Sequence, residues 1–354
     1  RSQSVDVITN YGVAAFLGQN GKLEGVKLSN GTELSCGLAV VAVGVRPNTK
    51  LAVEAGLEIG EVGGIKVNEY MQTSDPNIYA VGDCIEITNR ITGVKVHAPY
   101  GDLANLEGRI AGENAVLGNA VKFPGTIQTG ICKIFEYAAG VTGLTERSAK
   151  KAGFDVVTVV NSSPDKPIFM NGKLLVTKLV VEKESGRILG AQCVGPGDVA
   201  KQIAQWAMAV SGKLFVEDIV NADLPYAPPF SLAIDHFVAT AHVMQNKMKN
   251  RMKGVSAAQV KEKLDAGAPL FILDIRDAVE FEGMRLGIGE ILIPLGALRR
   301  RLNELPTDKN AEIVCYCKIS LRGYEAALVL EANGWNNVTV MEGGIMAWPY
   351  AREK

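Results

Sequence analysis

The chain has 354 residues, of which 47% are hydrophobic, and its 37 basic and 38 acidic residues leave a formal net charge of −1. This length allows two or three domains with cores of their own. The balanced charge argues against a nucleic-acid partner, which would require a basic excess. No apolar run reaches the roughly 18 residues of a membrane-spanning helix, and the first ten residues lack the apolar segment of a signal peptide. We therefore expect a cytoplasmic protein with no membrane partner.

The six cysteines are scattered along the sequence and include no pair spaced Cys-x-x-Cys. They stand at positions 36, 84, 132, 193, 315 and 317. This arrangement predicts neither a disulfide framework nor a metal site, and it is typical of a protein kept in a reducing compartment.

Residues 1–46 are predicted to form strands. Two Asn-Gly pairs, Asn20-Gly21 and Asn30-Gly31, are each flanked by alternating apolar residues. Such a pair favours a tight type I′ hairpin turn, which needs positive φ at both central residues. The apolar run 38–47 predicts a further strand, stopped by Pro47. The following sequence predicts a short helix and loop over 51–60, two strands around a turn over 63–84, and a helix over 102–116.

Residues 123–250 are predicted to form an α+β domain with an antiparallel sheet. Strands are expected at 154–160, 173–182 and 187–195, with turns at Asn171-Gly172 and Ser185-Gly186.

An amphipathic helix is expected over 198–212 and should end at Gly212. Its apolar face must be covered, either by a second copy of the chain or by its own sheet. We favour the first and expect a homodimer; the face consists of Ile203, Trp206, Ala207 and Val210.

Residues 246–254 carry four cations and no acid, which indicates a solvated linker more than a functional basic patch. After this segment helices and strands alternate, which predicts a parallel sheet wrapped by helices. Ser256 and Gln259 form a capping-box pattern at the start of the first helix. The expected helices are 256–267, 296–305 and 322–334, and the expected strands are 269–276, 311–317 and 338–341.

The stretch "CYCKISLRG" at 315–323 contains the strongest candidate for chemistry. Strand alternation places Cys315 and Cys317 on one face, but only Cys317 stands at the end of its strand. In open α/β sheets, ligands bind beyond the carboxyl ends of the strands. Loop N–H groups, a following helix N-terminus, Lys318 and Arg322 should stabilise a thiolate at Cys317. The alternative is an inert, buried cysteine.

This loop resembles the active-site loop of rhodaneses, and three further stretches resemble that family: "ILDIRDAVEFEG" (272–283), "IPLGALRRRL" (293–302) and "VMEGGIMAW" (340–348). The resemblance implies that Cys317 carries sulfane sulfur as a persulfide, in a loop closed by Arg322. The loop has the six-residue length of the sulfur-handling members, whereas related phosphatases use a longer one. One departure is Gly283-Met284-Arg285, where the family often has Gly-His-Ile. The substrate loop between the two end residues consists of Lys318, Ile319, Ser320 and Leu321.

The middle of the chain resembles the FAD-dependent pyridine nucleotide–disulfide oxidoreductases, in "IYAVGDC" (78–84), "VVAVGVRPNT" (40–49), "VTGLTERSAKKAG" (141–153) and "YAPPFSLAIDH" (226–236). The resemblance implies a strand that ends at Gly82-Asp83. The Asp83 carboxylate would accept a hydrogen bond from the ribityl chain of FAD, and Gly82 would allow the cofactor to approach closely.

A flavin reductase followed by a rhodanese resembles the coenzyme A-disulfide reductase and NADH-dependent persulfide or polysulfide reductase group. In that group the tyrosine at Tyr226 reaches into the partner subunit's active site, and the residue at Asn105 contacts coenzyme A. Phe169, Met170 and Ile234 depart from the group's pattern, which puts coenzyme A disulfide as the substrate in doubt.

Two features of that family are missing from the sequence. There is no Gly-x-Gly-x-x-Gly, and no cysteine stands where the redox cysteine would be. The chain is therefore expected to be part of a longer protein lacking roughly 150–200 N-terminal residues. FAD and NAD(P)H would serve the full-length protein, and we expect neither to be retained here.

The predicted fold class is a multidomain α/β and α+β protein with five parts in order. They are the end of an NAD-binding domain (1–50), the end of an FAD-binding domain (51–122), an α+β dimerisation domain (123–245), a linker (246–253) and a rhodanese-like α/β domain with a parallel sheet (254–354).

Two functions of different kinds remain open. One is an FAD- and NAD(P)H-dependent reductase of disulfides, persulfides or polysulfides, with Cys317 as sulfur carrier. The other is a non-redox dimeric scaffold that carries a persulfide-binding rhodanese module. A water- or peroxide-forming NADH oxidase would share the middle motifs, but it would not explain residues 254–354.

Overall fold

The computed structural model describes residues 5–354 and divides into two compact units, which meet in sequence between Arg46 and Pro47. Each is described by itself. The first unit is an antiparallel sheet of three strands: β1 (Val13–Gln19), β2 (Lys22–Leu28) and β3 (Glu33–Ser35).

The two predicted hairpins both form, but their turns differ. Asn20 and Gly21 have φ values of 53° and 75°, which confirms the type I′ turn between β1 and β2. In the second turn only Gly31 has positive φ, so the type I′ prediction is wrong there. The Asn30 side chain instead accepts a hydrogen bond from Thr32 N at 3.1 Å, a local bond that selects another turn.

The strand predicted over residues 38–47 does not form. Leu38, Val40 and Val43 are 80%, 84% and 91% exposed, and no strand of the described residues pairs with this run. A strand is stable only when a neighbour satisfies its backbone groups, so an apolar run alone was not sufficient.

The second unit begins with a three-stranded sheet and two helices. The prediction that a strand ends at Gly82-Asp83 is wrong. Residues Gly82–Cys84 form a 3₁₀ turn, and a strand begins only after it, at Ile85. Gly82 has a φ of 78° and donates its N–H to the Glu107 side chain, so it cannot continue a ladder. The elements are α1 (Lys50–Glu54), β4 (Ile65–Lys66), β5 (Ile85–Thr88), β6 (Lys95–Val96) and α2 (Gly101–Leu117).

A five-stranded antiparallel sheet follows, in the order β7-β8-β11-β10-β9. It confirms the predicted antiparallel sheet and the three predicted strands, now β9, β10 and β11. Two strands were not predicted, the edge strand β7 and its neighbour β8. The bounds are β7 (Gly130–Ile134), β8 (Tyr137–Gly143), β9 (Val156–Pro164), β10 (Leu174–Glu182) and β11 (Ile188–Gly195), with α3 (Glu146–Lys151) between β8 and β9.

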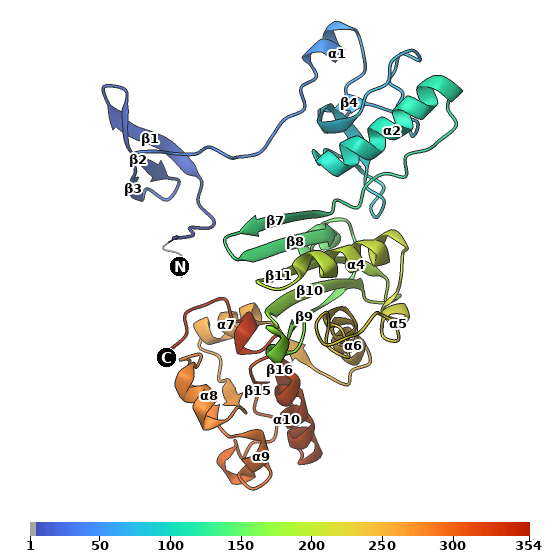
Figure 1. The fold of residues 1–354 in the computed structure, drawn as a ribbon. Coiled ribbons are helices and arrows are strands. Elements are labelled where there is room, and N and C mark those ends of the chain that lie inside the picture. Colours follow the sequence, from blue (N-terminus) through green and yellow to red (C-terminus); the bar gives the residue numbers. More distant parts are fainter. Residues whose placement is uncertain (1–4) are drawn as a thin grey trace. The chain divides into compact units, whose positions relative to one another are not determined.

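Helices α4 (Val199–Ser211), α5 (Val216–Ile219) and α6 (His236–Met248) accompany this sheet (Figure 1). Helix α4 is capped by Asp198 and ends at Gly212, as predicted. It packs on β8 and β11 of its own chain, and Ile203, Trp206 and Val210 are buried there. The inference of a dimer from this face is therefore wrong, and the alternative, packing on its own sheet, is correct.

The cationic segment 246–254 is exposed only in part. Helix α6 continues through Met248, and Met252 is buried. Lys247 Nζ donates to Thr158 O at 2.8 Å and pairs with Glu342. Lys247 and Met252 are thus packed, whereas Lys249, Arg251 and Lys253 are exposed.

The C-terminal sheet is parallel, as predicted, in the order β12-β16-β15-β13-β14. The capping box at Ser256 and Gln259 is present. The long helix predicted over 296–305 is instead a short helix and a 3₁₀ turn, because the chain bends at Arg301, which pairs with Glu304. The strands are β12 (Gly254–Val255), β13 (Phe271–Asp274), β14 (Ile291–Leu292), β15 (Ile313–Tyr316) and β16 (Val338–Met341); the helices are α7 (Ala257–Asp265), α8 (Ala278–Gly283), α9 (Leu295–Leu298) and α10 (Leu321–Ala332). None of the helices in residues 5–354 has the length and hydropathy needed to span a membrane.

Candidate active site

Cys317 is the first residue after β15, at the carboxyl end of the parallel sheet. Its side chain is buried, with the whole residue only 1% exposed. Its carbonyl accepts a hydrogen bond from Ile345 N at 2.9 Å, and the carbonyl of Lys318 accepts one from Met346 N at 3.2 Å. The segment after β16 therefore holds the loop from behind.

Gly344 makes that close support possible. A Cβ at this position would lie 2.4 Å from Cys317 O and 2.6 Å from Lys318 O. Its φ is 59°, a conformation that L side chains rarely adopt. A glycine is thus required on both grounds. Gly344 lies in the stretch 340–348 that resembles the rhodaneses, but the sequence alone does not show that it supports the loop.

The loop presents N–H groups that could hold an anion. Ser320, the N-cap of α10, has a φ of 88°, and its Oγ donates to Met341 O at 2.9 Å. In the part of the chain that the structure describes, no acceptor is found for the backbone N–H of any residue from Lys318 to Gly323. Consecutive free N–H groups at a helix N-terminus form a concave anion site. These N–H groups include those of Lys318, Ile319, Ser320 and Leu321, whose role as a substrate loop stays a prediction.

Arg322 lies at the loop but shares its charge with a carboxylate. Its Nη1 and Nη2 donate to the two oxygens of Glu280, at 2.7 and 2.8 Å. Glu280, and after it Cys317, raise the pKa of Arg322, while Arg322 lowers the pKa of Glu280. Arg322 thus interacts with both Glu280 and Cys317, and the prediction that it stabilises a thiolate at Cys317 stays a prediction. Lys318 has an exposed side chain, and it makes no ion pair within residues 5–354.

Glu280 is in turn positioned by a buried ion pair. Asp274, at the end of β13, binds Arg276, and their side chains are 0% and 2% exposed. Arg276 also donates from Nη1 to Glu280 O at 3.1 Å and from Nη2 to Met284 O at 2.8 Å. These bonds fix α8, and with it the carboxylate that orients Arg322. Arg276 and Glu280 both lie in the stretch 272–283 that resembles the rhodaneses. No pattern in the sequence, however, pairs Glu280 with Arg322.

Cys315 has a different environment, as predicted. It is 0% exposed within β15, and burial raises the pKa of its thiol. A thiol that cannot ionise is a poor nucleophile. Of the two cysteines, only Cys317 adjoins the loop N–H groups.

Gly82, Asp83 and Asn105 lie in a second neighbourhood, where the 3₁₀ turn packs on helix α2. Glu107 is buried, which raises the pKa of its carboxyl, and it accepts the N–H of Gly82 at 2.7 Å. His97 is hydrogen-bonded to Asp83 O at 2.8 Å. Asn105 Nδ2 donates to Gly101 O at 2.7 Å, within the first turn of α2. Neither His97 nor Glu107 was predicted, since no motif marks them.

Asp83 fits one part of the FAD that the family implies. Its side chain is exposed, and its carboxylate has no hydrogen-bond partner in the described residues. A free carboxylate can accept a bond from a ribityl hydroxyl. The side chain of Tyr226 is 53% exposed.

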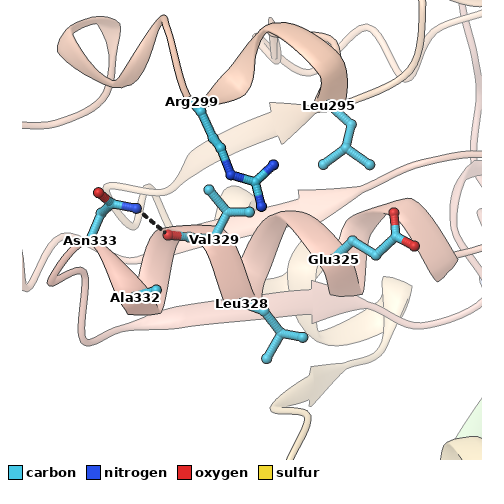
Figure 2. Close-up of a pocket in the computed structure, with 7 residues that line it drawn as sticks. All are labelled: Leu295, Arg299, Glu325, Leu328, Val329, Ala332 and Asn333. Atoms are coloured by element: carbon cyan, nitrogen blue, oxygen red, sulfur yellow. Dashed lines mark hydrogen bonds between the residues drawn. The ribbon is translucent and has the colours of Figure 1, made fainter.

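A shallow groove of about 370 Å³ runs between α9 and α10 (Figure 2). It includes Leu295, Arg299 and Glu325, and along its floor Asn333 Nδ2 donates to Val329 O at 2.8 Å. No cysteine lines it, so the sulfur chemistry is not assigned there.

Comparison with protein families identifies three parts of the chain. Residues 1–99 match the pyridine nucleotide-disulphide oxidoreductases, and residues 129–238 match the dimerisation domain of the same family. These two segments of the chain are therefore similar to that family. Residues 256–350 match the rhodanese-like domain, in agreement with the loop geometry at Cys317.

Curated proteins that are similar to this chain include sulfur oxidoreductases and polysulfide/persulfide reductases. The chain is 37% identical over 219 residues to the NAD(P)H sulfur oxidoreductase (CoA-dependent) of Pyrococcus furiosus, covering 62% of this chain and 49% of the relative. It thus spans about half the length of the curated relatives that it matches.

Two solved structures match nearly the whole chain. The NAD-dependent persulfide reductase from A. fulgidus is 40% identical with a TM-score of 0.90, over 99% of this chain and 62% of that one. The reduced Bacillus anthracis CoADR-RHD is 32% identical with a TM-score of 0.82, over 96% and 59% respectively.

Proposed function

We propose that Cys317 accepts sulfane sulfur and carries it as a persulfide. The Cys317 thiolate attacks the outer sulfur of a persulfide, the S–S bond breaks, and the released thiolate takes up the proton; the net reaction converts one persulfide and one thiol into another such pair. The observation that supports this is the position of Cys317 before six N–H groups without acceptors. Those groups would stabilise a persulfide anion.

The same chain would serve an FAD- and NAD(P)H-dependent reductase of disulfides, persulfides or polysulfides. This rests on the family and on the names of its relatives. Asp83 and Gly82 would hold the ribityl part of FAD, and the flavin, when bound, supplies the transfer of electrons from NAD(P)H to sulfur. Asn105 would contact the substrate. Whether that substrate is coenzyme A disulfide depends on positions such as Ile234, which departs from the related group.

We propose a cytoplasmic homodimer as the working form, with Tyr226 of one subunit reaching the active site of the other. The family's dimerisation domain at 129–238 supports this arrangement. The half-exposed side chain of Tyr226 leaves it available for such a contact.

The two cysteines of the loop region provide a matched test. Cys317→Ser should abolish persulfide labelling of the chain and sulfur transfer from thiosulfate to cyanide. Cys315→Ser should retain both, since that thiol is buried in the strand. Arg322→Ala should retain labelling but slow the transfer, because the loop loses one anion contact. Equal loss of activity in two folded cysteine variants would mean that the pair acts together and would contradict a single carrier.

A further inference from the structure

A cleft of about 390 Å³ opens beside the sulfur-carrying loop. One wall comes from the loop and the start of α10, with Ile319, Leu321 and Tyr324. The opposite wall comes from β9 and α6 and includes Ser162 and Val243, with Ile234 just before α6. Strand β9 and Ile234 belong to the part of the chain that matches the dimerisation domain, whereas most of α6 follows the end of that match at residue 238. The cleft's volume is that of a small-molecule site.

The cleft offers no free charge to an anion. Glu342 lines it, but one carboxylate oxygen is paired with Lys247 and the other accepts Val160 N at 3.0 Å. His242 also lines it, and its Nε2 is bonded to Val220 O at 2.8 Å. Arg322 is not among the lining residues. Of the other thirteen lining residues seven are apolar and none is charged. Burial in this cleft therefore favours a carbon chain more than an inorganic dianion.

One polar group in the cleft has no partner. Ser162 is 1% exposed, and no hydrogen bond to its Oγ is found within residues 5–354. A buried hydroxyl without a partner is costly to the fold. A polar atom on a bound molecule would supply the missing bond.

We propose that this cleft binds the uncharged carbon chain of an organic persulfide, or of its thiol, while the sulfur end reaches the loop of Cys317. The inference rests on the proposed function and names organic persulfides as the class of substrate for the site at Cys317. Its second part is that β9 and α6 select the donor, although they lie outside the rhodanese-like domain. The reaction is the exchange already written, with the organic thiol as the leaving group.

The test uses the full chain and two sulfur donors, butyl persulfide and thiosulfate. The variant Ile234→Glu places a carboxylate at the cleft, at a residue that is 52% exposed and so tolerant of charge. Sulfur loading of Cys317, followed by mass spectrometry, should fall about tenfold with butyl persulfide, which corresponds to about 1.4 kcal/mol, and less than about twofold with thiosulfate. The matched control Val116→Glu, at a site 82% exposed on α2, should change neither rate.

Binding provides a readout that does not need sulfur transfer. In the Cys317→Ser background, ligand-observed NMR should detect pentanethiol and mercaptobutanol in the cleft, and Ile234→Glu should weaken both. Ser162→Ala should weaken mercaptobutanol alone, because only that thiol carries a terminal hydroxyl.

The outcomes separate the two proposals. If the wild-type chain loads sulfur from neither donor while the thiols still bind, the proposal that Cys317 carries sulfur is contradicted. The proposal that the cleft binds the carbon chain is then supported. If loading proceeds but Ile234→Glu affects both donors equally, or neither, the cleft proposal is overturned alone.

Discussion

Backbone contacts, more than charged side chains, hold the residue that would carry sulfur. Cys317 is fixed through its carbonyl by Ile345 N, and Gly344 lies directly against the loop carbonyls. Because a loop amide can bind an anion only in one orientation, small displacements of this backbone should reduce persulfide formation.

We expect Gly344→Ala to impair both stability and sulfur loading. Its Cβ would lie 2.4 Å from Cys317 O, so the loop must move. The matched control is Gly267→Ala, which also has positive φ, at 72°, but has nothing within 4 Å of the added Cβ. Both variants should lose about 1–2 kcal/mol from backbone strain, but only Gly344→Ala should lower the loading rate, by about tenfold or more. Loading rates measured by mass spectrometry and urea unfolding separate the effects; equal loading by the two variants would contradict a role of Gly344 in loop geometry.

The identity of the candidate cysteine could be predicted because it depends on local order along the chain. Cys317 ends a strand and begins a loop before a helix, which the sequence shows directly. The pairing of Arg322 with Glu280 could not be predicted, since it joins residues 42 positions apart through the packing of α8. The Asp274–Arg276 pair joins residues only two positions apart, but its burial and the bond from Arg276 to Met284 O depend on how the chain packs.

Among the secondary-structure elements, the start of α6 is anchored to the sheet by a buried histidine. His236 is 0% exposed, its Nδ1 lies 2.6 Å from Ser163 Oγ on β9, and its Nε2 lies 2.7 Å from Thr177 Oγ1 on β10. Burial lowers the pKa of His236 to about 4. Neither hydroxyl could be paired with this histidine from the sequence.

This histidine should make the fold less stable in acid. In the unfolded chain a histidine binds its proton from about pH 6.5 downward, whereas the folded one does so only near 4. The unfolded state therefore binds more protons in this window. The group's contribution is complete above about pH 6.5, and about 3 kcal/mol of stability is lost as the pH falls to 4.

We expect His236→Gln to flatten this dependence, because glutamine offers a donor and an acceptor but does not titrate. Urea unfolding at pH values from 7 to about 4.5 measures the difference between the wild type and the variant. Parallel pH curves for the two proteins would show that His236 is not the responsible group.

A single carboxylate connects the dimerisation sheet to the segment that supports the loop. Glu342 follows β16, is buried, and binds Lys247 of α6 and the N–H of Val160 on β9. We expect Glu342→Gln to cost about 2–4 kcal/mol in the free energy of unfolding, because Lys247 would be left largely buried without its counter-charge. The control Glu312→Gln removes a more exposed ion pair, in which the side chains of Lys263 and Glu312 are 43% and 22% exposed. It should cost less than about 1 kcal/mol. Similar losses in both variants, measured by urea unfolding, would exclude a special role for Glu342.

Elements were predictable where periodicity and caps agree, as in α4, α7 and the parallel strands. The failures share a cause. The run 38–47 is apolar enough for a strand but has no neighbour to pair with, and the turn at Gly82 depends on a bond to Glu107 from another element. A sequence pattern shows which side chains of a segment are apolar. It does not show whether another strand or helix lies where it can pair with that segment.

For the whole molecule, we expect the expressed chain to purify without stoichiometric FAD. The sequence has no Gly-x-Gly-x-x-Gly to bind the pyrophosphate. The contact that Asp83 can make to a ribityl hydroxyl supplies about 1.5–3 kcal/mol, whereas nanomolar retention needs about 12 kcal/mol. The flavin absorbance of the purified protein measures the outcome. A yellow protein with one flavin per chain would show that other residues of this chain bind the cofactor.

The last prediction concerns the oligomeric state, and it depends on a surface other than the helix α4. Strand β7 is the edge of its sheet (Figure 1), and its hairpin with β8 exposes Ile131, Ile134, Phe135 and Tyr137, each more than half exposed. An apolar edge of this kind can pair with the edge strand of another chain.

We expect a dimer at micromolar concentration by light scattering, and we expect Phe135→Asp to shift the equilibrium toward the monomer. Aspartate suits the test because Phe135 has a φ of 52°, which aspartate tolerates, so the variant should fold. Val116→Asp, at an 82% exposed residue of α2, is the matched control and should remain dimeric. A monomeric wild type, or a Phe135→Asp protein as dimeric as the control, would exclude this hairpin as the interface.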